Sequence, residues 1–85
     1  MPESEYNYYN YRRRGDNKTL MNDNLGALQD YNKSINLNNK DCYGYLSRGM
    51  LKFKMKDIKG ASSDWSKAGE LGCEEAYDLI KNYYK

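Results

Sequence analysis

The chain has 85 residues, of which 31% are charged and 39% hydrophobic, and its formal net charge is +2. This length allows one small domain over residues 1–85 with a single core. The weak net charge gives no support to a nucleic-acid partner or a membrane-surface partner, and no stretch approaches the ~20 apolar residues that span a bilayer.

Residue types that carry chemistry are scarce. The chain has no histidine, the commonest general base and metal ligand, and its glycines are too dispersed for a phosphate-binding loop. We therefore expect no enzyme activity, cofactor, metal or small-molecule substrate. The cysteines Cys42 and Cys73 do not form a CxxC pair. We interpret them as buried, reduced thiols of a cytoplasmic protein.

Hydrophobic periodicity predicts five helices. In chain order they cover residues 4–18, 24–37, 41–55, 57–71 and 74–84, with a turn at 19–23 and a polar break at 38–40. Asp57 is well placed as an N-cap. Gly72 is expected to end the fourth helix as a C′ glycine.

The chain repeats itself without gaps at an offset of 34 residues. Such a period is typical of stacked helix-turn-helix units. We therefore predict an all-α fold, in which antiparallel helix hairpins stack as a short α-solenoid. The matching positions are Tyr9/Tyr43, Tyr11/Tyr45, Arg14/Arg48, Gly15/Gly49, Lys18/Lys52, Met21/Met55, Asp23/Asp57, Gly26/Gly60, Ala27/Ala61, Asp30/Asp64, Lys33/Lys67, Leu37/Leu71 and Tyr43/Tyr77.

Two of these repeated features suggest contacts within each hairpin. Glycine inside a helix costs about 1 kcal/mol relative to alanine, so a repeated Gly15 and Gly49 predicts a close helix approach. Ala27 and Ala61 are the expected small partners across that contact.

An arginine and an acid also recur, sixteen residues apart: Arg14 with Asp30, and Arg48 with Asp64. We hypothesise that these pairs are ion pairs tying the two helices of each hairpin together.

The order of large, small and aromatic residues resembles the tetratricopeptide repeat. The second copy reads Tyr45, Gly49, Ala61, Trp65 and Ala68, and the first reads Tyr11, Gly15, Ala27, Tyr31 and Ser34. The resemblance implies one repeat over residues 8–41, a second over 42–75 and a C-terminal capping helix over 76–85. The segment "WSKAGELGCEEAYDLI" suggests Sel1-like repeats as the alternative.

In the tetratricopeptide family the first helix of each repeat lines a concave groove. The resemblance therefore implies a module that binds a peptide or partner protein, with Tyr9, Tyr43 and Tyr77 as a ladder along the groove. Asp16, Leu46 and Met50 stand where a carboxylate clamp would need basic or polar groups. The alternative function is structural self-association, with the groove or the repeat ends buried against another copy in a homo-oligomer. The candidate binding residues are Tyr9, Arg12, Arg13, Asp16, Leu20, Tyr43, Leu46, Ser47, Met50, Phe53, Lys54, Tyr77, Ile80 and Tyr84.

Overall fold

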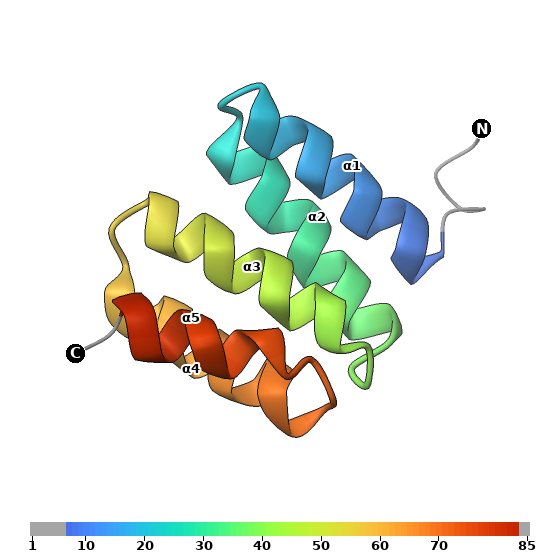
Figure 1. Cartoon of the computed structure of the whole chain (residues 1–85). Coiled ribbons are helices and arrows are strands. Elements are labelled where there is room, and N and C mark those ends of the chain that lie inside the picture. The colour runs from blue at the N-terminus through green and yellow to red at the C-terminus, as the bar shows by residue number, and fades with distance from the viewer. Residues whose placement is uncertain (1–6, 84–85) are drawn as a thin grey trace.

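The computed structural model of the chain describes residues 7–83, which form five helices and no strand. The helices are α1 (Tyr8–Leu20), α2 (Asn24–Leu37), α3 (Cys42–Lys54), α4 (Ile58–Glu70) and α5 (Glu75–Tyr83), as Figure 1 shows. The predicted all-α class and the five helices are confirmed. Among the described residues no helix has the length and apolar character that crossing a bilayer requires.

The first helix departs most from its predicted bounds. Asn7 caps it, because its side chain accepts a hydrogen bond from the Asn10 amide at 2.9 Å. At the other end the helix continues to Leu20, so Thr19 and Leu20 are helical although a turn was predicted there. The expected start at residue 4 lies outside the described residues.

The other helix ends use aspartate caps and left-handed residues. Asp57 caps α4 as predicted, and Asp23 caps α2 in the same way, each accepting from an amide three residues later at 3.0 Å. The predicted C′ role of Gly72 is confirmed by its φ of 111°. Asn22 and Lys56 take the same position after α1 and α3, with φ of 63° and 69°.

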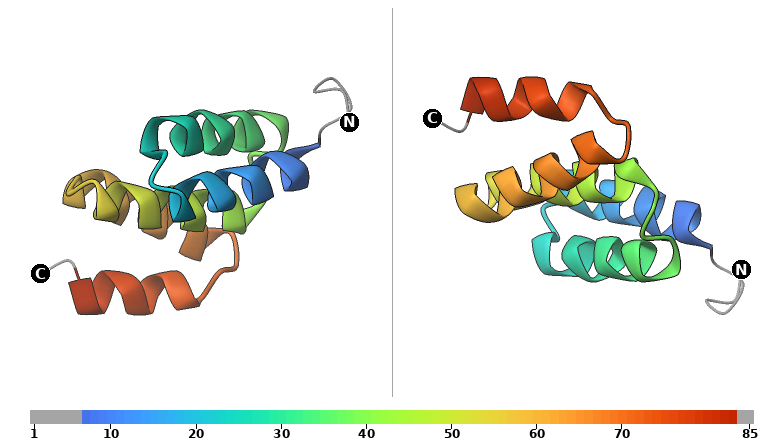
Figure 2. Two further views of the ribbon diagram at one scale, coloured as in Figure 1. Left: turned by 90° about the horizontal axis from the view of Figure 1, so that it is seen from above. Right: turned by 90° about the horizontal axis from the view of Figure 1, so that it is seen from below.

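The helices form two antiparallel hairpins and a final helix that stack in one direction. Helix α1 pairs with α2 and α3 pairs with α4, while α3 also packs on α2 and α5 packs on α4. Figure 2 shows α2 on one side of the stack and α5 on the other. The molecule is elongated, with principal extents of 42 × 26 × 15 Å.

Each hairpin closes over a glycine, and the partner across the contact is an aromatic ring. A Cβ on Gly15 would lie 2.7 Å from Tyr31, and one on Gly49 would lie 2.6 Å from Trp65. The close approach was predicted, and the aromatic rings, not the expected alanines, are its nearest neighbours. For Gly49, the Ala61 carbonyl oxygen is the next neighbour, at 3.2 Å from such a Cβ.

The repeated arginine–aspartate pairs are present in both hairpins, as hypothesised. In each pair the guanidinium donates two hydrogen bonds of 2.8 Å to the carboxylate, Arg14 to Asp30 and Arg48 to Asp64. Burial disfavours a charged Asp30, but the hydrogen bonds from Arg14 and Lys18 outweigh it and hold the pKa of Asp30 below its usual value. The geometry is bidentate and therefore fixes the angle of the pair as well as its distance.

Two lysines complete these contacts. Lys18 Nζ lies 3.1 Å from Asp30 Oδ2, and Lys52 Nζ lies 3.1 Å from Asp64 Oδ2. Each buried carboxylate is thus held by two cations of the preceding helix. We call each set of arginine, lysine and aspartate the hairpin clamp.

The last helix is out of register with the sequence repeat by one residue. Helices α1 and α3 start 34 residues apart (42 − 8), as do α2 and α4 (58 − 24), but α3 and α5 start 33 apart (75 − 42). The packing shows the same shift. Where α3 packs on α2, Gly44 faces Ile35, since a Cβ on Gly44 would lie 3.1 Å from Ile35. Where α5 packs on α4, Tyr77 faces Gly69 and covers it with its ring. Gly69 stands 34 residues after Ile35, but Tyr77 stands only 33 after Gly44.

This shift bears on two of the predicted groove residues. The ladder of Tyr9, Tyr43 and Tyr77 does not form, because the Tyr77 ring lies on α4 at Gly69. Ile80 is half-buried and packs against the buried cluster of Ala61, Trp65, Ala68, Cys73 and Ala76, as Phe53 also does. Tyr84, the last residue of the predicted row, lies outside the described residues.

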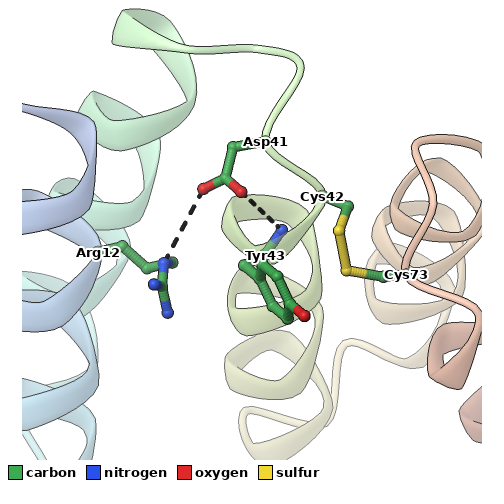
Figure 3. The surroundings of a disulfide bond; sticks show 5 residues. All are labelled: Arg12, Asp41, Cys42, Tyr43 and Cys73. Carbon is green, nitrogen blue, oxygen red and sulfur yellow. Dashed lines mark hydrogen bonds and ion pairs between the residues drawn. A yellow bond between two sulfur atoms is a disulfide. The ribbon is translucent and has the colours of Figure 1, made fainter.

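The two cysteines form a disulfide, so the prediction of reduced thiols was wrong. Cys42 at the start of α3 is bonded to Cys73 just before α5. Figure 3 shows the bond joining α3 to the chain that leads into α5. Sequence spacing gave no sign of it, since the fold brings together two residues 31 positions apart.

We expect Asp64→Ala to lower the free energy of unfolding by about 3 kcal/mol, because the half-buried Arg48 and Lys52 would lose the carboxylate that pairs with both of them. Thermal unfolding followed by circular dichroism measures the loss, with Lys59→Ala on the exposed face of α4 as the matched control. An unchanged melting temperature for Asp64→Ala would contradict the structural role of the hairpin clamp.

Reduction of the disulfide should destabilise the fold by about 3 to 4 kcal/mol in the chain-entropy account of a loop this long. Melting temperatures with and without a dithiol measure this effect, and the double variant Cys42→Ser/Cys73→Ser serves as a control that reductant leaves unaffected. Two titratable thiols in protein purified without reductant would contradict the bond itself.

Candidate functional site

The candidate site is an open pocket of about 500 Å³ between α1 and α3. Its wall is mainly apolar, because Leu20, Met50 and Phe53 contribute to it alongside Tyr31 and Leu51. Leu20 is 83% exposed and Met50 is 50% exposed. Large apolar side chains are thus open to solvent at the pocket rather than buried within it. Its remaining lining residues are Asp16, Thr19, Ser47 and Lys54.

Polar groups at the pocket are organised around Tyr31. The Tyr31 hydroxyl donates to Asp16 Oδ1 at 2.6 Å and lies 3.2 Å from Thr19 Oγ1. Burial, followed by the hydrogen bond to Asp16, raises the pKa of Tyr31 well above its usual value. The hydroxyl therefore keeps its proton, and it holds the Asp16 carboxylate in a fixed orientation beside the pocket.

Lys54 closes one contact between the two hairpins. Its Nζ donates to the Thr19 carbonyl oxygen and to Asn22 Oδ1, both at 2.9 Å. Both acceptors belong to the end of α1 and the turn after it. Lys54 thus links the two helices that form the pocket walls.

Next to the pocket, Arg12 lies between two tyrosine rings. Its guanidinium carbon is 5.3 Å from the Tyr9 ring centroid and 5.6 Å from that of Tyr43, within the range of cation–π attraction. Two carboxylates lie near the same guanidinium, Asp16 at 3.6 Å and Asp41 at 3.9 Å. Figure 3 shows Arg12 reaching from α1 toward Asp41, whose other oxygen accepts from the Tyr43 amide.

The group thus includes two carboxylates, Asp16 and Asp41, beside the Arg12 guanidinium. Arg13 adds a second cation next to it, because its guanidinium carbon lies 5.7 Å from the Tyr9 ring centroid and it donates to the Tyr9 hydroxyl at 2.8 Å. We call Tyr9, Arg12, Asp16, Asp41 and Tyr43 the Arg12 cluster.

The predicted site residues divide into three groups. Asp16, Ser47, Met50, Phe53 and Lys54 line the pocket, and Leu20 does so as well. Tyr9, Arg12, Arg13 and Tyr43 surround or belong to the Arg12 cluster. Leu46 packs against the core, as Ile80 does, while Tyr77 covers Gly69.

Three pocket residues were missed: Thr19, Tyr31 and Leu51. Thr19 was placed in a turn, and Tyr31 was interpreted only as a repeat-defining core residue. The hydroxyl of Tyr31 was the available signal, because a buried phenol needs a hydrogen-bond partner. Leu51 is 1% exposed and forms the base of the pocket from α3.

No family model, curated protein sequence or solved structure matches this chain. Within residues 7–83, no three or more His, Cys, Asp or Glu side chains are grouped so that they could hold a metal ion. The pocket itself offers an apolar surface, hydroxyl groups and one oriented carboxylate. Such a set of groups suits the binding of a side chain from a partner.

We expect Tyr31→Phe to lower the free energy of unfolding by about 2 kcal/mol, because it removes the hydrogen bond that the Tyr31 hydroxyl donates to the charged Asp16 carboxylate. Urea unfolding measures the change, and Tyr8→Phe, on an exposed ring, is the matched control. If both variants unfold at the same urea concentration as the original chain, the Tyr31–Asp16 hydrogen bond does not organise the pocket.

Proposed function

We propose that this protein is a tetratricopeptide-type binding module without catalysis. Its partner is a peptide or protein segment that places apolar side chains in the pocket between α1 and α3. The observation that carries the proposal is the open apolar pocket itself, with Leu20 and Met50 exposed on its walls. Solvent-exposed apolar side chains beside a concavity are typical of interaction surfaces.

The flexible side chain of Met50 suits such a surface. Methionine is unbranched and polarisable, and it adapts to partners of different shape. It lies beside the rings of Tyr31 and Phe53 among the pocket residues. An amphipathic helix or an extended segment laid along α1 and α3 would bury these groups together.

The α1 end of the stack is less suited to binding than the groove. In α3, Gly44 and Leu51 face α2, where Leu51 packs with Ala27 and Tyr31. The same repeat positions in α1 hold Asn10 and Asn17, and Asn17 is exposed. The outer face of α1 thus presents amides at positions where stacking would require apolar or small groups. This favours a partner in the groove over end-to-end association.

Self-association is the second candidate. Its specific support is the group of exposed apolar residues around the turn between α1 and α2, where Leu20, Met21 and Leu25 are each at least 70% exposed. A second copy could cover this turn together with the pocket. In that case the groove would serve assembly rather than an external partner.

The disulfide bears on where this binding takes place. The sequence led us to expect a cytoplasmic protein, on the basis of reduced thiols. A bond between Cys42 and Cys73 is typical of an oxidising compartment, because cytosolic thiols are kept reduced. We therefore propose that the binding module works in an oxidising compartment.

A random peptide library displayed on phage tests the binding role. We expect the selected peptides to bind the Met50→Glu variant at least tenfold more weakly than the original chain. The reason is that the new carboxylate would be desolvated in an apolar site when a peptide binds. Isothermal titration calorimetry measures both affinities.

Met21→Glu is the matched control, since Met21 is 76% exposed and does not line the pocket. Its affinity should equal that of the original chain. Selected peptides that bind Met50→Glu as tightly as they bind the original chain would exclude the groove as the binding surface.

A further inference from the structure

The contact between α3 and α5 is filled with aromatic rings. The Phe53 centroid lies 5.7 Å from that of Trp65 and 5.1 Å from that of Tyr83, and Trp65 lies 6.5 Å from Tyr83. These rings come from three different helices. The second hairpin and the last helix are therefore joined by a three-ring cluster.

The contact between α1 and α3 stands one repeat earlier and corresponds to it position by position. Phe53 and Trp65 correspond to Thr19 and Tyr31 at the offset of 34. Tyr83 corresponds to Met50 at the offset of 33 that relates α5 to α3. Thr19, Tyr31 and Met50 all line the pocket. The pocket thus lies where the neighbouring repeat holds its aromatic cluster.

The α1–α3 contact and the α3–α5 contact differ in the size of the side chains that fill them. Threonine stands in place of phenylalanine, and the flexible methionine stands in place of tyrosine. The ring of Tyr31 remains, as the counterpart of Trp65. One aromatic side chain beside Thr19 would restore the packing that Phe53 provides one repeat later, with offset or edge-to-face ring contacts to Tyr31 and Phe53.

We propose that the pocket receives an aromatic side chain of the partner, and that a basic residue next to it pairs with the Arg12 cluster. This proposal rests on the proposed function and specifies the partner that the groove takes. The aromatic ring would contact Thr19, Tyr31 and Met50. Met50 adds a thioether, which makes favourable contacts with ring edges.

Charge complementarity gives the flanking residue. Asp16 is shared by the pocket and the Arg12 cluster, and its side chain is 39% exposed. Asp41 is less accessible, since its side chain is 16% exposed. The ammonium group of Lys54 is directed to the Thr19 carbonyl and Asn22. A lysine or arginine of the partner would therefore find the accessible Asp16 carboxylate at the edge of the pocket.

Three capped pentapeptides test the proposal: Ala-Lys-Trp-Lys-Ala, the same peptide with Leu for Trp, and the Trp peptide with Glu for both Lys. Each is titrated into isotope-labelled protein while the Thr19 amide and the Met50 methyl resonances are followed. We expect the Trp–Lys peptide to shift both resonances, and to bind at least fivefold more tightly than either of the other two peptides.

The outcomes separate this inference from the proposed function. A leucine peptide that binds at Met50 as tightly as the tryptophan peptide would overturn the aromatic preference and leave the groove as a binding site. A Glu peptide as tight as the Lys peptide would overturn the charge preference. If none of the three shifts Met50 while a library-selected peptide does, the inference fails and the proposed function stands.

Thr19→Phe provides an internal test, because it copies Phe53 at the corresponding position. The added ring should occupy the pocket, weaken the Trp–Lys peptide at least tenfold, and leave the helical content unchanged. Met21→Phe adds a ring outside the pocket and should leave the affinity unchanged. If Thr19→Phe does not fold, Met50→Tyr replaces it as the test. This variant copies Tyr83 at the corresponding position and should also weaken the binding of the Trp–Lys peptide at least tenfold. Unchanged affinity in whichever of these variants folds would overturn the proposal.

Discussion

The structure depends on two glycines that let an aromatic ring lie directly against a helix backbone. At Gly15 and Gly49 there is no room for a Cβ, because the rings of Tyr31 and Trp65 occupy the space. A methyl group there would displace a large buried ring or separate the helices of the hairpin. The cost of glycine in a helix, about 1 kcal/mol relative to alanine, is offset by the burial of these rings. The crossing of each hairpin, and so the orientation of the next, follows from this contact.

The hairpin clamp acts on the same helix pairs from the side. Each buried aspartate lies one residue before the aromatic residue, at Asp30 before Tyr31 and at Asp64 before Trp65. A bidentate arginine and a lysine hold the carboxylate against the first helix of the hairpin. The ring contact sets the distance between the helices, and the clamp restricts their rotation and sliding. Both hairpins carry both devices, so the same kinds of contact close each repeat.

The proposed function rests on the places where the repeats differ. Tyr31 and Trp65 both pack on a glycine, but only Tyr31 has a hydroxyl to orient Asp16. Phe53 meets Tyr83, whereas its counterpart Thr19 lies at an open pocket. The second hairpin is completed by α5 and by the disulfide, which ties α3 to the start of α5. The first hairpin leaves its corresponding surface open toward solvent, and this surface is the one that we propose binds a partner.

Much of this architecture could be predicted from the sequence. The recurrence of Arg14 and Asp30 as Arg48 and Asp64 was sufficient to predict the arginine–aspartate pairs of the clamp, because both partners repeat at one spacing. The lysines of the clamp were not predicted. The predicted helix bounds were close to the observed ones where a capping residue marked the start of a helix, as Asp57 does for α4. These features are local, or they repeat, so they need no knowledge of distant contacts.

The pocket and the register of α5 could not be predicted in this way. Helix α4 is one residue shorter than α2, because it ends at Glu70 before the left-handed Gly72. One residue turns a helix by about 100°, and with this turn the Tyr77 ring lies on Gly69 of α4. The correspondence of Met50 with Tyr83 depends on that register, and the disulfide depends on the fold that brings its cysteines together.

The central claim is that the groove between α1 and α3 is free to receive a partner. Light scattering over a range of protein concentrations tests this most directly. We predict a monomer of 10.0 kDa at every concentration. A dimer whose mass does not change with dilution, and which Met50→Glu converts to a monomer, would contradict the claim, because the groove would then be occupied by a second copy of the chain.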